Sequence, residues 1–252
     1  MENEKEFWEK YWTKEKRNFA KVEKFIFSEI IEKHIPELKE KNCEKEYFEV
    51  GCAPGNIMVF FNKVYGYQVS GCDFINCKII EKNIKKAGVE QVQLYEEDFR
   101  KMDLDKKYNI VASYGFVEHF QNYSDILSKH KKLVAEDGYI IIELPNIRKF
   151  NYILYKVFAP ELLNIHNLKV MDINVLRKEI EDNEFQIIYD NYYLSNIFMA
   201  NRDNELINKK KVMKYIFLFI RKLFELLHCV NIPNKYFSPY IICIAKRKKG
   251  RE

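Results

Sequence analysis

The sequence lacks any apolar run that approaches the roughly 20 residues needed to span a bilayer as a helix. Residues 1–14 are rich in charge and have no apolar core of the kind that marks a signal peptide. Internal repeats and low-complexity tracts are also absent. These absences argue against a membrane-spanning or exported protein, and we expect a cytoplasmic location.

Paired cysteine motifs are missing as well. The six cysteines are Cys43, Cys52, Cys72, Cys77, Cys229 and Cys243. None of them forms a Cys-x-x-Cys pair, which is the usual spacing of a zinc cluster, and their scatter does not resemble a disulfide framework. The pattern therefore predicts reduced thiols, which fit a cytoplasmic protein.

The composition is that of a globular domain, but its charge is unevenly placed. Apolar residues make up 47% and charged residues 31% of the chain, and the net charge is +5. Residues 205–252 contain 12 Lys and Arg against three Glu, a net charge of +9, which leaves −4 for residues 1–204. A basic C-terminal segment fits an anionic partner such as a phosphate, a lipid head group or a nucleic acid, or simply a solvated basic face.

We expect a small helical cap, residues 1–44, followed by one main domain, residues 45–252. Aromatic and apolar residues recur at helical spacing between Lys5 and His34, which predicts one or two amphipathic helices over one end of the main sheet. Pro36 and the polar residues after it form the connection to the main domain.

From Glu46 onward, short apolar runs alternate with helical patterns, as in repeated βαβ units around a parallel sheet. Strands are expected at residues 47–50, 68–72, 91–95, 110–113 and 139–143, with helices at 55–64, 77–87 and 123–135 between them. The spacing predicts a doubly wound, Rossmann-like α/β fold with helices on both faces of the sheet.

The rest of the chain carries more elements of the same domain. A long irregular stretch at about 146–170 precedes a helix at 173–182 and a strand at 185–192. An insertion at about 203–235 contains a basic amphipathic helix, and a last strand follows at 240–245.

The strongest chemical signal is the segment from Phe48 to Asn56, in which a strand ends in Glu49 and a glycine-containing turn opens a helix. Glycine at positions 51 and 55 lets the backbone turn sharply and approach a ligand closely. The dinucleotide-binding fingerprint is Gly-x-Gly-x-x-Gly, whereas alanine and proline occupy positions 53 and 54 here. The turn alone therefore does not decide between cofactors. A plain strand-to-helix turn is the alternative interpretation.

Two further acids follow later strands of the predicted sheet. Asp73 lies 22 residues after Gly51, where an acid can accept hydrogen bonds from both hydroxyls of a ribose, and Asp98 follows the third strand. Either aspartate could instead cap a helix.

Together these features resemble class I S-adenosylmethionine-dependent methyltransferases of the small-molecule, sugar- or quinone-modifying type. The segment Ser113-Tyr114-Gly115-Phe116-Val117-Glu118-His119 and the final Ser238-Pro239-Tyr240 strand also resemble that family. The resemblance implies a seven-stranded sheet with an antiparallel last strand and S-adenosyl-L-methionine as cofactor. It implies cofactor contacts from Glu49, Gly51, Cys52, Ala53, Gly55, Asp73, Phe74, Asp98, Phe99 and Tyr114. Cys52 could equally be a small packing residue.

Methyl transfer is an in-line displacement, so the protein mainly aligns the reactants, and a hydroxyl acceptor benefits from a general base. His119 and His166 are the candidate bases, each with a structural role as its alternative. His166 lies in the 146–170 stretch, where the resemblance places the acceptor pocket. Glu118 lacks the neighbouring acids that a hard cation requires, and we expect no metal.

The resemblance favours O-methylation of a small acceptor, with a phosphorylated or nucleotide-linked sugar of a surface-glycan precursor as the candidate. An RNA-modifying methyltransferase, a non-catalytic cofactor-binding protein and an NAD-dependent dehydrogenase are the alternatives, and a nucleic-acid partner is disfavoured because no separate RNA-binding module is evident. The basic amphipathic helix at 209–228 could cover the acceptor pocket, form a homodimer or contact a membrane surface, and the last of these is the minority interpretation.

Overall fold

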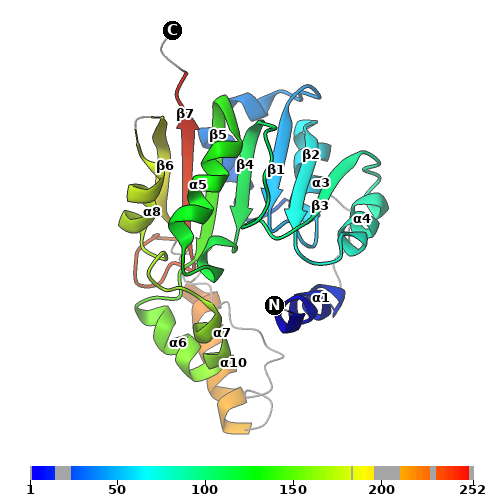
Figure 1. The fold of residues 1–252 in the computed structure, drawn as a ribbon. Coiled ribbons are helices and arrows are strands. Elements are labelled where there is room, and N and C mark those ends of the chain that lie inside the picture. The colour runs from blue at the N-terminus through cyan, green and yellow to red at the C-terminus, as the bar shows by residue number, and fades with distance from the viewer. Residues whose placement is uncertain (1, 15–23, 183, 196–210, 228–230, 250–252) are drawn as a thin grey trace.

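The structure is a computed structural model that describes residues 2–14, 24–182, 184–195, 211–227 and 231–249. Seven strands form one sheet in the order β3-β2-β1-β4-β5-β7-β6 (Figure 1). The strands are β1 (Glu46–Val50), β2 (Gln68–Asp73), β3 (Val92–Glu96), β4 (Tyr108–Tyr114), β5 (Val134–Pro145), β6 (Phe185–Tyr193) and β7 (Tyr240–Arg247). β7 runs antiparallel to both of its neighbours, which confirms the predicted Rossmann-like sheet.

The strand order reverses between β1 and β4, because β2 and β3 extend to one side of β1 and the later strands to the other. Open α/β sheets bind ligands at such a switch point, outside the carboxyl ends of the strands. β1 can lie at the centre of the sheet because both of its faces are apolar. On one face the ring centroids of Tyr47 and Phe61 are 3.9 Å apart, and on the other those of Phe48 and Tyr108 are 4.6 Å apart.

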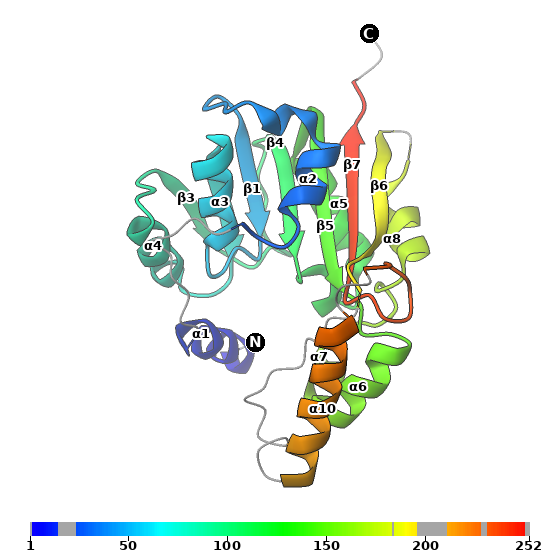
Figure 2. The same cartoon turned by 180° about the vertical axis from the view of Figure 1, so that it is seen from behind.

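Helices cover both faces of the sheet (Figures 1 and 2). One face carries α2 (Ser28–His34), the short helix η1 (Pro36–Lys39), α3 (Asn56–Tyr65) and α4 (Cys77–Lys86). The other carries α5 (Tyr123–Leu133) and α8 (Ile173–Ile180). Each face has its own buried apolar cluster, so the sheet is enclosed as a doubly wound fold requires.

The stretch at 146–170 is more regular than expected. It contains α6 (Phe150–Phe158) and α7 (Pro160–Ile165). Leu154 and Phe158 of α6 pack against Phe217 and Phe224 of α10 (Lys211–Leu227), the described part of the basic amphipathic helix. The local pattern missed α6 because its apolar face is completed by a helix more than 50 residues away in the chain.

The helices α6, α7 and α10 extend beyond the carboxyl ends of β1, β4 and β5, and we call them the helical projection (Figures 1 and 2). The first helix, α1 (Glu2–Lys14), lies below the same ends of β1 and β2. Within the described residues, none of the helices is both long enough and apolar enough to cross a membrane.

Candidate functional site

The turn after β1 is built so that its backbone can face a ligand. Gly51 and Gly55 both adopt positive φ angles, +70° and +98°, which L side chains rarely tolerate. The amides of Gly51 and Cys52 donate to the carbonyl oxygen of Cys72 at 2.9 and 3.2 Å, which ties the turn to the end of β2. A Cβ at Gly51 would lie 2.5 Å from the ring of Phe116, so the close approach depends on glycine.

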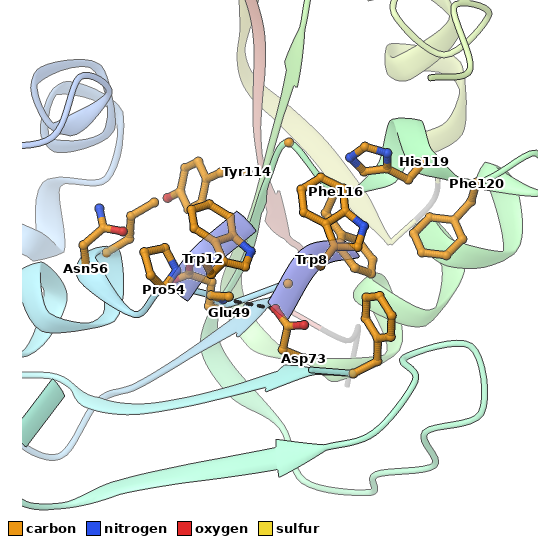
Figure 3. Close-up of a pocket in the computed structure, with 15 residues that line it drawn as sticks. Trp8, Trp12, Glu49, Pro54, Asn56, Asp73, Tyr114, Phe116, His119 and Phe120 are labelled. Carbon is orange, nitrogen blue, oxygen red and sulfur yellow. Dashed lines mark hydrogen bonds between the residues drawn. The ribbon is translucent and has the colours of Figure 1, made fainter. Parts of the chain in front are cut away.

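Asp73 ends β2 and stands directly beside this turn (Figure 3). Its Oδ2 accepts from the amide of Ala53 at 3.1 Å, and its Oδ1 accepts from the amide of Ile75 at 3.2 Å. Burial raises the pKa of the Asp73 carboxyl, and the backbone donors oppose that rise. The carboxyl therefore orders the turn and still faces the cavity with acceptor capacity to spare.

Glu49 is the second buried acid at the carboxyl end of the sheet. Its Oε2 accepts from the hydroxyl of Tyr47 at 3.1 Å, and only 4% of the residue is exposed. Burial raises the pKa of Glu49 to about 8, against the lowering effect of the Tyr47 hydroxyl. A buried carboxyl with a pKa this high is a recognised sign of a functional site.

These residues enclose a cavity of about 240 Å³ over the switch point (Figure 3). Its lining comprises Trp8, Trp12, Glu49, Gly51, Ala53, Pro54, Asn56, Ile57, Asp73, Phe74, Tyr114, Gly115, Phe116, His119 and Phe120. We call it the donor cavity. Of the predicted cofactor contacts, Glu49, Gly51, Ala53, Asp73, Phe74 and Tyr114 therefore lie together on one cavity.

Trp8 and Trp12 of α1 cover this cavity, and sequence reasoning did not place them there. Lys5 pairs with Glu96 at 3.0 Å, and Glu9 accepts from the amide of Asn76 at 2.9 Å, so both contacts fix α1 to the ends of β2 and β3. The two tryptophans are four residues apart and share a helix face. That spacing was visible in the sequence, but it did not reveal which surface the face would cover.

Asp98 and Phe99 lie at a separate, smaller cavity of about 30 Å³ that shares Asp73 and Phe74 with the donor cavity. The carboxylate of Asp98 is held by Arg100, with Nε at 2.9 Å and Nη2 at 2.6 Å, and this guanidinium lowers the pKa of Asp98. Asp98 Oδ1 also accepts from the Arg100 amide, as a turn-capping aspartate does. Asp98 and Phe99 therefore lie beside Asp73, next to the donor cavity but outside its lining.

Two predicted contacts, Cys52 and Gly55, line neither the donor cavity nor the smaller cavity. Cys52 is fully buried and faces Gly71, where an added Cβ would lie 2.8 Å from the cysteine Cβ. Its thiol is a packing group, and burial raises its pKa well above the usual value. Gly55 begins α3, with Ile84 against the position of its missing Cβ at 2.9 Å. Both residues shape the turn from behind.

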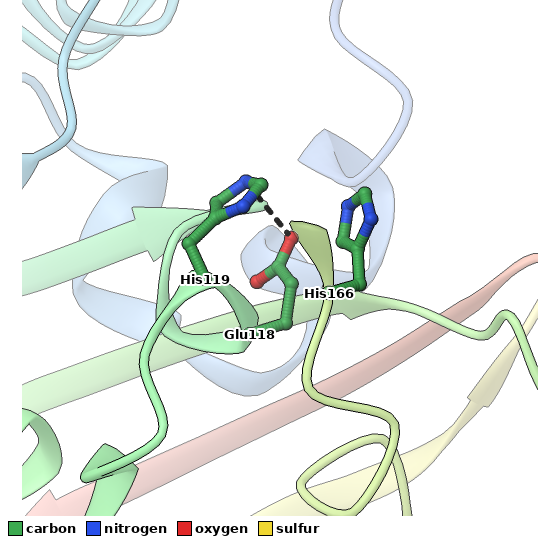
Figure 4. Close-up of side chains that lie close together, drawn as sticks. All are labelled: Glu118, His119 and His166. Carbon is green, nitrogen blue, oxygen red and sulfur yellow. Dashed lines mark ion pairs between the residues drawn. The ribbon is translucent and has the colours of Figure 1, made fainter. Parts of the chain in front are cut away.

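The predicted bases His119 and His166, 47 residues apart in the sequence, come together with Glu118 (Figure 4). The two imidazole rings lie 4.8 Å apart, and Nε2 of His119 is 3.9 Å from Oε1 of Glu118. Nδ1 of His119 contacts the Ile165 carbonyl at 3.1 Å, and Nδ1 of His166 contacts the Leu162 carbonyl. A carbonyl beside each Nδ1 places the proton there and leaves a lone pair on each Nε2.

Burial controls the charge of this cluster. It lowers the pKa of His119 to about 4, with His166 as a second cause, and it also lowers the pKa of His166. Glu118 is 1% exposed, and burial raises its pKa to about 8. The ligand-type atoms of all three lie within 4.8 Å of one another, so this is the group of described residues that could hold a metal ion.

His119 connects the donor cavity to a second cavity of about 730 Å³. This second space, which we call the outer cavity, is lined by Glu6, Phe7, Trp8, Lys10, His119, Gln121, Asn164 and Ile165. Trp8 and His119 border both cavities, with their rings 5.3 Å apart. His166 supports His119 from the side of α7 and is not part of either lining.

Comparisons with known proteins agree with this geometry. A family model described as a methyltransferase domain matches residues 22–189. The chain is 24% identical over 107 residues to the "Probable (S)-tetrahydroprotoberberine N-methyltransferase 2" of Papaver bracteatum. That match covers 41% of this chain and 30% of the relative, so the chain spans about a third of the curated protein it matches.

Solved structures share the fold at low sequence identity. The MccD protein superposes with a TM-score of 0.58 at 16% identity, covering 88% of this chain and 95% of that one. Coclaurine N-methyltransferase, crystallised with N-methylheliamine and S-adenosylhomocysteine, gives a TM-score of 0.55 at 11% identity and covers 91% of this chain and 80% of its own. At these identities the likeness concerns the arrangement of the elements.

Proposed function

Because this chain belongs to the methyltransferase domain family, whose class I members use S-adenosyl-L-methionine, we propose that it methylates a small-molecule acceptor, with a hydroxyl oxygen as the preferred target. The observation that carries the proposal is the junction of two cavities at His119, one suited to a nucleotide donor and one free for an acceptor. S-adenosylmethionine supplies a methyl group on a sulfonium that a nucleophile can displace in line.

The described residues fit this donor. Gly51 offers backbone without a Cβ where the methionine part would pass, and Asp73 offers carboxylate oxygens where both ribose hydroxyls would lie. Phe74, Phe99 and Asp98 line the smaller cavity beside Asp73, which at about 30 Å³ would admit only an edge of an adenine. Trp8 and Trp12 exclude water from above, which favours displacement by the acceptor over hydrolysis.

His119 is the residue placed to accept a proton from an acceptor hydroxyl. Its lowered pKa keeps the ring neutral near pH 7, so Nε2 has a lone pair available. Glu118 lies 3.9 Å away, and because burial raises its pKa to about 8, it holds its proton near pH 7 and supplies no fixed negative charge to the ring. His166 is a positioning residue in this proposal, because it contacts the ring of His119 and lines neither cavity.

The proposed acceptor class rests on the charge of the C-terminal segment. The outer cavity is lined by one cation, Lys10, and one acid, Glu6, whereas residues 205–252 carry a net charge of +9. Basic side chains favour a phosphorylated or nucleotide-linked acceptor, such as an activated sugar of a surface-glycan precursor. The N-methyltransferases among the related proteins make an amine the second candidate for the methylated atom.

Calorimetric titration with S-adenosylmethionine, S-adenosylhomocysteine and NAD tests the donor directly. We expect micromolar or tighter binding of the two sulfur nucleotides and at least tenfold weaker binding by Asp73→Asn, which loses the charge-assisted acceptor but keeps the side-chain shape. NAD binding without binding of the sulfur nucleotides would refute the proposal. An acceptor screen begins with phosphorylated sugars; product mass shows methyl transfer, and NMR of the product identifies the methylated atom.

A further inference from the structure

The helical projection has a buried inner side and an apolar outer side. On the inner side, Phe217 and Phe224 of α10 pack against Leu154 and Phe158 of α6. This contact buries one apolar side of α10. Other apolar side chains of the helix are exposed to solvent.

The outer side of α10 carries large apolar side chains that no described residue covers. Val212, Tyr215 and Phe219 are 68%, 70% and 71% exposed, respectively. Their spacing places them on one stripe along successive helical turns. Monomeric proteins rarely expose contiguous apolar patches of this kind without an interaction partner.

Neighbouring elements of the helical projection also expose apolar side chains. On α6, Ile153 and Val157 are 57% and 45% exposed and lie four residues apart on one face. The Phe150 ring at the start of α6 lies 6.4 Å from Phe224 and 5.1 Å from Phe237, which joins α6 to α10 and to the segment after it. We call the exposed apolar side chains of α6, α10 and residues 232–237 the apolar stripe.

Basic side chains border the apolar stripe. The exposed cations of α10, of α6 and its preceding residue, and of the segment after α10 are Lys149, Lys156, Lys214, Arg221, Lys222 and Lys235. The acids of the same described elements and of α7 are Glu161 and Glu225. An apolar stripe with an excess of cations is the pattern of helices that lie in the plane of a membrane surface. α10 is too short and too charged to cross the bilayer instead.

We propose that the helical projection docks the protein on membranes that contain anionic phospholipid, with the apolar stripe inserted at the boundary between head groups and acyl chains. The charges favour this occupant over a second copy of the chain. A two-fold interface places the same surface on both partners, so two basic borders would face each other, whereas anionic head groups neutralise them.

The position of the projection gives the docking a function. Asn164 and Ile165 at the end of α7 line the outer cavity together with His119. A docked projection therefore brings that cavity to the membrane surface, where an amphiphilic acceptor with a lipid tail is concentrated. This last step rests on the proposed function, whereas the docking itself does not.

Vesicle sedimentation of the full-length protein at about 0.1 M salt tests the docking. Vesicles of phosphatidylcholine with 30% phosphatidylglycerol are compared with phosphatidylcholine alone. We expect at least tenfold stronger binding to the anionic vesicles and at least a tenfold loss with Phe219→Glu, because a charge then enters the inserted stripe. The double change Lys214→Glu and Lys222→Glu should weaken binding to the anionic vesicles to a similar degree.

Matched controls separate the docking surface from general effects of added charge. Ile188→Glu introduces the same charge at an exposed apolar residue on β6, and Lys82→Glu reverses a charge on α4; both should bind like the wild type. Absence of binding to anionic vesicles, or equal losses for Phe219→Glu and Ile188→Glu, would overturn the proposal. A second result would also overturn it: sedimentation velocity shows a dimer that Phe219→Glu dissociates, and this dimer does not bind vesicles. The apolar stripe would then be the interface between two copies of the chain.

Calorimetry with S-adenosylmethionine on the same variants keeps the two proposals apart. Phe219 lies outside the donor cavity, so Phe219→Glu should bind the nucleotide as the wild type does, which also shows that the variant is folded. Vesicle binding without nucleotide binding would refute the proposed function and leave the docking intact.

Discussion

Replacement of Gly51 by alanine tests whether the turn after β1 depends on glycine for the reason given above. The added Cβ meets two obstacles: a backbone at φ +70° and the Phe116 ring 2.5 Å away. An alanine in the left-handed region costs about 1–2 kcal/mol. Forcing an aromatic ring to move in a packed site costs about 1–3 kcal/mol more. We expect Gly51→Ala to lower the free energy of unfolding by about 2–5 kcal/mol.

Gly88→Ala is the control, because it carries the backbone cost without the collision. Gly88 has φ +74°, but a Cβ there would meet only the flexible end of Lys63 at 3.4 Å. Urea unfolding should therefore show a loss of about 1–2 kcal/mol for Gly88→Ala. Its affinity for S-adenosylmethionine should be unchanged, since Gly88 follows α4 and does not line the donor cavity.

The nucleotide affinity of Gly51→Ala should fall at least tenfold, because Phe116 forms part of the donor cavity and must shift into it or away from it. Adding Phe116→Ala removes the ring that collides. The double variant should therefore lose less unfolding free energy than the two single changes added together. Equal stability losses for Gly51→Ala and Gly88→Ala, with equal nucleotide affinity, would refute the steric argument.

The remaining predictions concern the buried acid and the two histidines. Glu49 has a pKa of about 8 in the folded chain, above its usual 4.5, so the folded state holds a proton that the unfolded state releases. The contribution of Glu49 to the free energy of unfolding should therefore be greatest below pH 4.5 and fall as the pH rises towards 8. In Glu49→Gln, the free energy of unfolding measured with urea should decline less steeply between pH 5 and 8. A decline of the same steepness in both proteins would contradict the raised pKa. His119→Ala should reduce kcat for a hydroxyl acceptor by about 10²–10⁴-fold with little change in nucleotide affinity. His166→Ala should reduce kcat less and alter its pH profile, because His166 acts through His119; a larger effect at His166 would reverse the two roles.

The sequence predicted the parts of the fold that local patterns encode. Five strands of alternating βα units, the glycine turn at 51 and 55 and the acids at 49 and 73 follow from periodicity and from strand ends, and the observed sheet confirms the fold class. Parallel strands bring their carboxyl ends to one edge, so the acids gather there once the strand order is known.

The parts that were missed depend on contacts between distant segments. The cover formed by Trp8 and Trp12 requires α1 to be fixed by Glu96 and Asn76, which no local pattern reveals. Cys52 lies in the turn, but its side chain packs toward β2, whereas its neighbours Gly51 and Ala53 line the cavity. Successive residues of a tight turn point in different directions, which the sequence alone does not show. The meeting of His119 and His166 likewise depends on how α7 returns to the sheet.

The position of Trp8 on both cavities has a kinetic consequence. The donor would lie beneath α1, and the acceptor would lie on the other side of Trp8 in the outer cavity. While the acceptor fills the outer cavity, the donor can neither enter nor leave freely. We therefore expect an ordered cycle in which S-adenosylmethionine binds before the acceptor and S-adenosylhomocysteine departs last. In such a cycle the spent nucleotide competes with the donor alone.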